Sequence, residues 1–239
     1  MIQLKQVSKR YGGIKAVHNL NLHIKKGDIF GFIGPNGAGK TTTIRLIAGL
    51  LAPSEGTVLI DNVNMKHEPV RAKKKIGLIP DRPFLYEKLT GFEFMRFTAD
   101  LYECNQTSLE NKIEELLTMF SLFDRGNELI ESYSHGMKQR LIMSAALLHD
   151  PSIIIIDEPM VGLDPKAIIL VKQLFKNLSQ NGTTIFISTH TLTLAEDICD
   201  YIGIINNGML IASGTLEELK QSTHSEHTNL EKVFLEICK

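Results

Sequence analysis

The sequence contains no tryptophan and only three cysteines among its 239 residues. Cys104, Cys199 and Cys238 lie far apart and show no metal-ligand spacing, which indicates free thiols in a reducing compartment. Internal repeats and low-complexity segments are also missing. The composition, with 43% hydrophobic and 22% charged residues, is typical of a globular protein with a sizeable core, organised as one large domain or two small ones.

The sequence also lacks long apolar runs and an excess of charge of one sign. No stretch approaches the roughly 20 apolar residues that span a bilayer, and the N-terminus lacks the apolar core of a secretory signal. We therefore expect the protein to stay in the cytoplasm and to need a partner for any role at a membrane. The formal net charge of -1 gives no basic field that would favour nucleic acid. The one basic cluster, at residues 71–75, is interpreted as a solvated face.

One stretch, residues 34–41, matches the G-x-x-x-x-G-K-[ST] pattern of a phosphate-binding loop. Its residues are Gly34, Pro35, Asn36, Gly37, Ala38, Gly39, Lys40 and Thr41. The mostly apolar residues 28–33 predict a short buried strand before the loop, and apolar residues recur at helical spacing after it. This strand–loop–helix context is the one that the motif requires. The alternative is a glycine-rich turn that only happens to contain Lys-Thr.

The residue types of this loop suit a chain of phosphates. The glycines let the backbone curl so that successive N–H groups point at an anion. The N-terminus of the following helix adds a partial positive charge. Lys40 supplies a full positive charge to the β- and γ-phosphates of a nucleotide, and the hydroxyl of Thr41 is a ligand for magnesium.

The predicted elements change character twice along the chain. Alternating residues over 1–7 and 16–24 predict antiparallel strands before the loop. Residues 84–149 predict a helical subdomain, whose first helix begins with a capping box at Thr90 and Glu93. Sheet patterns then return with four consecutive isoleucines at 153–156, a run typical of a central strand buried on both faces.

Asp157 and Glu158 directly follow the four isoleucines. A carboxylate at the C-terminal end of a buried strand, beside a phosphate loop, is where a nucleotide-bound magnesium ion needs an acidic partner. We expect Asp157 to hold the metal and Glu158 to orient and deprotonate an attacking water. The alternative is a solvated strand end.

With these motifs the chain resembles, over nearly its whole length, the nucleotide-binding subunits of ATP-binding cassette (ABC) transporters. The matching stretches follow the family's order, and a signature between the phosphate loop and the Asp-Glu strand is the most specific of them. They are the aromatic Tyr11, the phosphate loop at 34–41, the glutamine loop at 76–81, the signature from 133, the strand motif at 153–158, the loop at 161–164 and the switch histidine motif at 188–190.

The resemblance implies an ATP site with Mg²⁺ and gives roles to single residues. The implied catalytic residues are Lys40, Glu158 and His190. The implied nucleotide-binding residues are Tyr11, which would stack on adenine, Val17, the loop 34–41, Thr42, Ser134 and Gly136. The implied metal ligands are Thr41, Asp81 and Asp157. In the family, two subunits pair head to tail, and the Ser134 and Gly136 positions of each close on the γ-phosphate held by the other.

Two places depart from the family pattern. His135 and Met137 stand where the signature usually has glycine and glutamine, although Ser134 and Gly136 remain. Asp81 stands where a glutamine normally links the magnesium site to the membrane partner. This second departure bears on how hydrolysis is coupled to that partner.

We therefore expect an α/β fold with a P-loop NTPase (RecA-like) core sheet. The core would comprise residues 1–83, including an N-terminal antiparallel β subdomain, and 150–220. The inserted α-helical subdomain carrying the signature would comprise 84–149, and the C-terminal tail and helix 221–239. The implied activity is ATP hydrolysis that powers transport, in the export direction, by ATP-driven dimerisation.

The expected partners are a separately encoded transmembrane permease and a second nucleotide-binding subunit, either an identical copy or a similar paralogue, with no nucleic acid. The expected location is the cytoplasmic face of the cell membrane. One alternative is a cassette ATPase with a mechanical role on ribosomes or DNA, but the chain has one cassette and no long coiled coil. Another is a small-molecule phosphotransferase, which the signature and the switch histidine disfavour.

Overall fold

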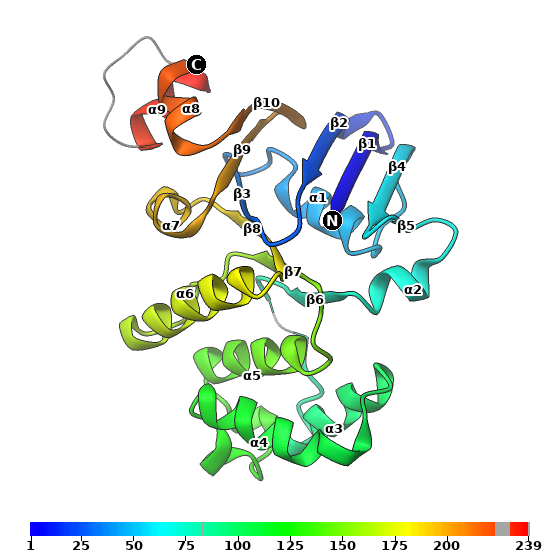
Figure 1. Ribbon diagram of the computed structural model, residues 1–239, viewed down its shortest axis with the longest axis vertical. Helices are drawn as coiled ribbons and strands as arrows, with labels where there is room; N and C mark the ends of the chain where they lie inside the picture. The colour runs from blue at the N-terminus through cyan, green and yellow to red at the C-terminus, as the bar shows by residue number, and fades with distance from the viewer. Residues whose placement is uncertain (83, 223–229, 239) are drawn as a thin grey trace.

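The computed structural model describes residues 1–82, 84–222 and 230–238, and its parts follow one another along the long axis (Figure 1). The strands are β1 (Ile2–Tyr11), β2 (Ile14–Ile24), β3 (Ile29–Ile33), β4 (Glu55–Ile60), β5 (Val63–Asn64), β6 (Ile76–Ile79), β7 (Ile153–Asp157), β8 (Thr184–Thr189), β9 (Tyr201–Asn206) and β10 (Met209–Gly214). The α-helices are α1 (Lys40–Ile47), α2 (Pro69–Lys73), α3 (Gly91–Leu101), α4 (Leu109–Met119), α5 (His135–Leu147), α6 (Pro165–Gln180), α7 (Leu192–Ile198), α8 (Leu216–Ser222) and α9 (Leu230–Ile237).

The core is a six-stranded sheet in the order β10-β9-β3-β8-β7-β6. Strands β9, β3, β8, β7 and β6 run parallel, and only β10 pairs antiparallel, in the hairpin with β9. The four isoleucines of β7 explain how the sheet is buried. Ile153 and Ile155 pack into the cluster that contains α1, and Ile154 and Ile156 into the one that contains α6. A strand covered on both faces needs apolar residues at every position, as predicted.

A second sheet, antiparallel in the order β2-β1-β4-β5, is the expected N-terminal β subdomain. The apolar residues that alternate along β1, Ile2, Leu4 and Val7, are buried against α1 and the core sheet. This sheet lies beside α1 and the phosphate loop, so it forms one side of the region where the strands of the core end (Figure 1).

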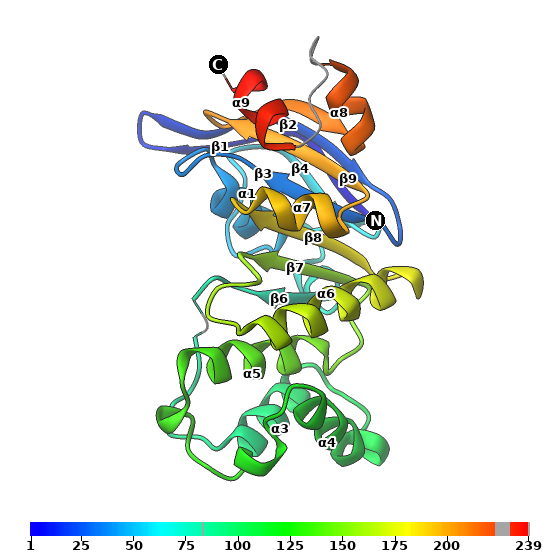
Figure 2. The ribbon, with the colours of Figure 1, turned by 90° about the vertical axis from the view of Figure 1, so that its left-hand side faces the viewer.

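The inserted helices α3, α4 and α5 form one end of the molecule, and α8 and α9 lie at the other (Figure 2). The predicted capping box opens α3: the Glu93 N–H donates to Thr90 Oγ1 at 3.2 Å, and the Thr90 N–H donates to Glu93 Oε2 at 2.8 Å. In α4, Leu109, Ile113 and Leu117 recur at helical spacing and are buried. The helical insertion is therefore specified by its own caps and apolar faces.

Some helix ends and short helices were not predicted. Helix α1 ends at Ile47 because Gly49 adopts a left-handed conformation at φ 66° that does not continue the helix. The short helix α2 holds part of the predicted basic cluster, and α7 was not predicted. Residues 223–229 of the expected C-terminal tail lie outside the described residues. No helix among the described residues is long and apolar enough to cross a bilayer.

Candidate functional site

The predicted residues of the phosphate loop and the two strand ends, with Asp81, meet at one edge of the core sheet, where β3, β8, β7 and β6 end side by side. The register pairs Asp157 with Ser188 and Ile33 with Thr189, so the segments after these strands lie next to one another. Open α/β sheets bind ligands in this position, outside the carboxyl ends of the strands. A cavity of about 390 Å³ opens there, lined by Ala16, Asn36, Gly37, Gly39, Lys40, Thr41, Thr42, Asp81, Asp157, Glu158, Val161 and His190.

The phosphate loop is curled around the side chain of Lys40. Gly39 has φ 109°, and a Cβ atom there would lie 2.5 Å from the Ala16 carbonyl oxygen, so only glycine fits. Lys40 Nζ donates to the carbonyl oxygens of Gly34 at 2.7 Å and Pro35 at 3.2 Å. Burial lowers the pKa of Lys40, and the nearby carboxylates of Asp157 and Glu158 oppose that shift. The loop thus holds the ammonium group of Lys40 close to the N–H groups at the start of α1, an arrangement that binds anions.

Thr41 and Asp157 join the phosphate loop to the end of β7. The Thr41 hydroxyl donates to Asp157 Oδ2 at 3.0 Å. Burial raises the pKa of Asp157, the hydrogen bond from Thr41 acts against this, and the carboxylates of Glu158 and Asp81 raise it further. A cation at this point would relieve the crowding of negative charge. These oxygen donors suit Mg²⁺, which retains waters and binds through few protein ligands. The described residues form no cluster of three or more His, Cys, Asp or Glu side chains that could hold a metal ion.

Glu158 is held at the end of the neighbouring strand β8. Its backbone is left-handed at φ 53°, and its N–H donates to the Ser188 carbonyl oxygen at 2.9 Å. Its Oε1 accepts from the backbone N–H of His190 at 3.0 Å and lies 2.6 Å from the ring Nδ1 of His190. Its Oε2 accepts from the Thr189 hydroxyl at 3.0 Å. The carboxylate is thereby fixed at the wall of the cavity that holds the phosphate loop.

Some predicted nucleotide-binding residues do not line this cavity. Tyr11 is 46% exposed, and the Nζ atom of Lys9 lies 5.5 Å from its ring centroid. The side chain of Val17 is fully buried in the core, whereas Ala16 before it lines the cavity. Ala16 and Val161 were not predicted as site residues. Ala16 precedes the predicted Val17, and Val161 opens the predicted loop at 161–164. These positions were the only signal, because neither side chain carries a distinctive chemistry.

Ser134 and Gly136 also lie away from this cavity, at the start of α5. Ser134 is exposed and caps the helix, accepting from the Met137 N–H at 3.3 Å. Gly136 packs so closely on the loop after Glu158 that a Cβ atom would lie 2.6 Å from the Gly162 carbonyl oxygen, and the ring of His135 covers Gly162. The signature therefore contacts the loop at Gly162 and leaves the N-terminus of α5 exposed.

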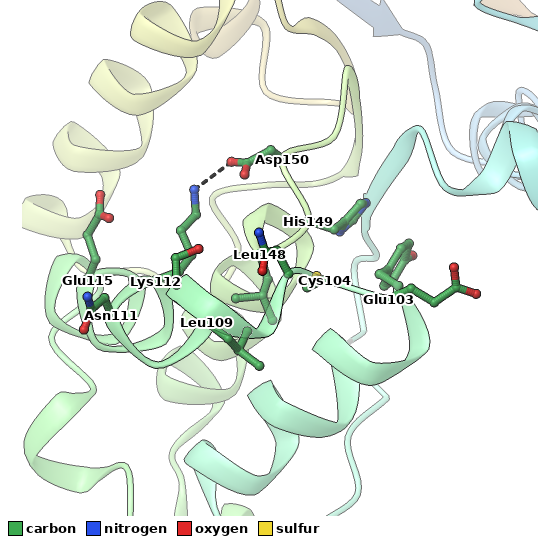
Figure 3. A pocket seen from close by; sticks show the side chains of 12 residues that line it. Glu103, Cys104, Leu109, Asn111, Lys112, Glu115, Leu148, His149 and Asp150 are labelled. Carbon is green, nitrogen blue, oxygen red and sulfur yellow. Dashed lines mark hydrogen bonds and ion pairs between the residues drawn. The ribbon is translucent and has the colours of Figure 1, made fainter.

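A second cavity of similar volume, about 400 Å³, lies among α3, α4 and the segment after α5 (Figure 3). The ring of His149 stacks on Tyr102 there at 3.7 Å, and Lys112 Nζ lies 2.7 Å from Asp150 Oδ1. None of the predicted site residues lines this cavity. Volume alone does not separate the two cavities, whereas the phosphate loop and the carboxylates single out the one at the sheet edge.

A glycine-rich loop that encloses a lysine and opens a helix at the carboxyl edge of a parallel sheet defines a P-loop nucleotide-binding protein. Residues 17–161 match the ABC transporter family. The chain belongs to this family and is an ATP-binding, ATP-hydrolysing subunit of an ABC transporter.

Relatives cover most of the chain. The ABC transporter ATP-binding protein NatA of Bacillus subtilis is 36% identical over 96% of this chain and 95% of its own length. The linearmycin resistance ATP-binding protein LnrL of the same organism is 37% identical over 92% of this chain and 70% of its own length.

Solved structures show the same fold. An ATP-binding subunit of an ABC transporter superimposes with a TM-score of 0.96 at 33% identity, over the whole of both chains. A dimeric ATP-binding cassette in a post-hydrolysis state, bound to ADP and Pi, superimposes with a TM-score of 0.83 at 30% identity, over 90% of this chain and 99% of that one.

Proposed function

We propose that this chain hydrolyses ATP in the cavity at the sheet edge and that Glu158 is the general base. The observation that carries the proposal is the fixed carboxylate of Glu158 on the wall of the cavity that contains Lys40. A proton passes from water to Glu158, and the water oxygen forms a bond to the γ-phosphorus. The bond from that phosphorus to the β–γ bridging oxygen breaks, leaving ADP and inorganic phosphate.

The remaining residues of the cavity bind and orient ATP in this proposal. Lys40 and the N–H groups of residues 34–41, with Thr42, hold the phosphates, and His190 contacts the γ-phosphate. Tyr11 stacks on adenine at the margin of the site, beside Val17. The residues that would hold Mg²⁺ are Thr41, Asp81 and Asp157, and the bound ion would neutralise charge on the phosphates.

A second copy, or a similar paralogue, completes each site. Ser134 and Gly136 lie at a helix N-terminus that does not face the cavity of its own chain, and such an end is suited to an anion. In a head-to-tail pair, two-fold symmetry would bring this end of each chain to the γ-phosphate bound by the other. ATP then holds the pair together, and hydrolysis releases it.

We infer that the transport partner is a separate transmembrane permease at the cytoplasmic face of the membrane. Phe84 and Tyr86, shortly after Asp81, form an exposed aromatic cluster with Phe97 of α3. Phe84 packs edge to face on Tyr86 and Tyr86 on Phe97, with ring centroids 6.1 and 5.2 Å apart. Phe84 is 81% exposed. A permease covering these rings would connect with the site through Asp81.

Export is the proposed direction. The relatives include linearmycin resistance, bacitracin transport and Nod factor export ATP-binding proteins, and their names support this direction. We further propose the domain boundaries given by the sequence, with 84–149 as the helical subdomain of one nucleotide-binding domain.

The proposal is tested by purifying the tagged chain from solubilised membranes and identifying its companion. We expect a protein with transmembrane helices that raises the rate of phosphate release. Phe84→Ser with Tyr86→Ser should lose the companion while the isolated chain still hydrolyses ATP. Leu50→Ser, at an equally apolar site that is 62% exposed, is the control and should keep the companion. If no protein with transmembrane helices is recovered with the ATP-hydrolysing chain from solubilised membranes, the transport role is contradicted.

A further inference from the structure

The structure carries a further inference about Thr189, which lies in the switch histidine motif but has no role assigned there. Its hydroxyl donates to Glu158 Oε2 at 3.0 Å and accepts from the backbone N–H of Thr191 at 3.0 Å. Thr189 is 1% exposed, so its side chain has little freedom to turn away. Both hydrogen-bonding functions of the hydroxyl are therefore committed, and its proton points at the carboxylate.

The two residues that hold Glu158 differ in mobility. The side chain of His190 is 63% exposed, and its ring can leave Glu158 to reach a γ-phosphate. Thr189 cannot follow such a movement, because it belongs to the last position of β8, paired with Ile33 of β3. Contact with Thr189 thus persists whatever the position of the histidine ring.

The contacts also show which lone pairs of the carboxylate remain open. A carboxylate has about four acceptor sites, two on each oxygen. Among the described residues, the N–H and the ring of His190 take both sites on Oε1, and Thr189 takes one site on Oε2. One site on Oε2 is left for a water.

We infer that Thr189 is a positioning residue, which fixes Oε2 of Glu158 so that its open lone pair accepts the proton of the attacking water. The inference rests on the role proposed above for Glu158. A misdirected lone pair weakens proton transfer without weakening the phosphate contacts, because Thr189 does not line the ATP cavity. Loss of the Thr189 hydroxyl should therefore lower kcat and leave KM nearly unchanged.

The test compares kcat, KM for ATP and the unfolding temperature for Thr189→Val, Thr189→Ser and a matched control. Thr184→Val is the control, because Thr184 is fully buried at the other end of β8. Like the hydroxyl of Thr189, its hydroxyl makes two hydrogen bonds: it donates to the Lys25 carbonyl oxygen and accepts from the Gly27 N–H. Both valine variants should lose similar thermal stability. Only Thr189→Val should lose about tenfold in kcat, with KM within about twofold, and Thr189→Ser should restore most of the rate.

Glu158→Gln, assayed in parallel, separates this inference from the proposed function. If Glu158→Gln is inactive while Thr189→Val keeps the wild-type kcat, the role of Thr189 is overturned and that of Glu158 stands. An equal loss of kcat in Thr184→Val, or no rescue by serine, also overturns it by showing a structural effect. A wild-type rate in Glu158→Gln would show that Glu158 is not the general base, and would overturn both the proposed mechanism and this inference.

Discussion

The ring Nδ1 of His190 lies 2.6 Å from Oε1 of Glu158, and this contact joins the ends of β8 and β7 at the cavity that contains the phosphate loop. Because an ionised carboxylate only accepts hydrogen bonds, Nδ1 must carry the proton in this contact. A neutral ring with its proton on Nδ1 has an acceptor at Nε2. The ring can therefore donate to the carboxylate and to a phosphate at the same time only as the doubly protonated imidazolium.

Replacing His190 should separate hydrolysis from binding. His190→Ala removes the ring that holds Oε1 and the donor expected at the γ-phosphate, so we expect phosphate release to fall by about 10²-fold or more. ATP binding, measured by fluorescence titration, should change little because the phosphate loop is intact. His23→Ala, at an exposed position on β2, serves as the control. A wild-type rate in His190→Ala would exclude this histidine from the reaction.

Ser134 provides a test of the head-to-tail pair. Ser134→Arg should leave ATP binding by one chain nearly intact, because Ser134 does not line that chain's cavity. The bulky side chain should nevertheless block the partner's γ-phosphate and prevent the ATP-held dimer. Size-exclusion chromatography in a Glu158→Gln background detects the dimer, with Thr118→Arg on the exposed face of α4 as the control. Lys40→Ala should lose ATP binding and the dimer together. A dimer that survives Ser134→Arg would contradict the pairing.

Asp81 should make ATP binding depend on magnesium. Its carboxylate lines the same cavity as Asp157 and Glu158, so without a cation it repels the phosphates of the nucleotide. Asp81→Gln keeps an oxygen ligand and removes the charge. We expect ATP titrations with and without Mg²⁺ to differ more for the native chain than for this variant. Equal dependence on Mg²⁺ in both proteins would remove Asp81 from the site and leave it a role in the turn after Pro80.

The buried, ionised carboxylate of Asp157 should lower the stability of the folded chain. Burial raises its pKa, so the folded chain binds this proton more tightly than the unfolded chain does. Above the folded pKa the ionised carboxylate therefore destabilises the fold, and this penalty disappears as the pH falls through the folded pKa toward the unfolded value. At neutral pH, without nucleotide or Mg²⁺, Asp157→Asn should raise the unfolding temperature by roughly 2–4 °C.

The same variant should lose Mg²⁺-dependent hydrolysis, and its gain in stability should shrink at acid pH. Asp124→Asn, at an exposed carboxylate, should leave the unfolding temperature almost unchanged. An unfolding temperature for Asp157→Asn at or below that of the native chain at neutral pH would contradict the account of the buried charge.

Local signals in the sequence predicted the parts of this structure that depend on neighbouring residues. The glycine pattern of residues 34–41 predicted a curled loop, and its left-handed glycines confirm it. The spacing of Thr90 and Glu93 predicted a cap whose two hydrogen bonds are both present. The short helices α2 and α7 were missed because helices of five and seven residues span too few turns to show a period.

Relationships between distant strands could not be predicted in the same way. The hydrogen bond between Thr189 and Glu158 depends on β8 lying next to β7, and on a register that pairs Asp157 with Ser188. Neither the strand order nor the left-handed backbone of Glu158 has a local signature. The likeness to a family supplied the list of residues at the sheet edge, and the structure supplied the contacts among them.

The central claim is that Glu158 accepts the proton of the attacking water, and one measurement tests it most directly. It is the rate of phosphate release by Glu158→Gln relative to the native chain, at saturating ATP and Mg²⁺. The amide keeps the size of the side chain and its contact with Thr189 but cannot serve as a base. We predict a rate about 10²–10⁴-fold lower, with ATP still bound. Release of phosphate at the native rate would contradict the account.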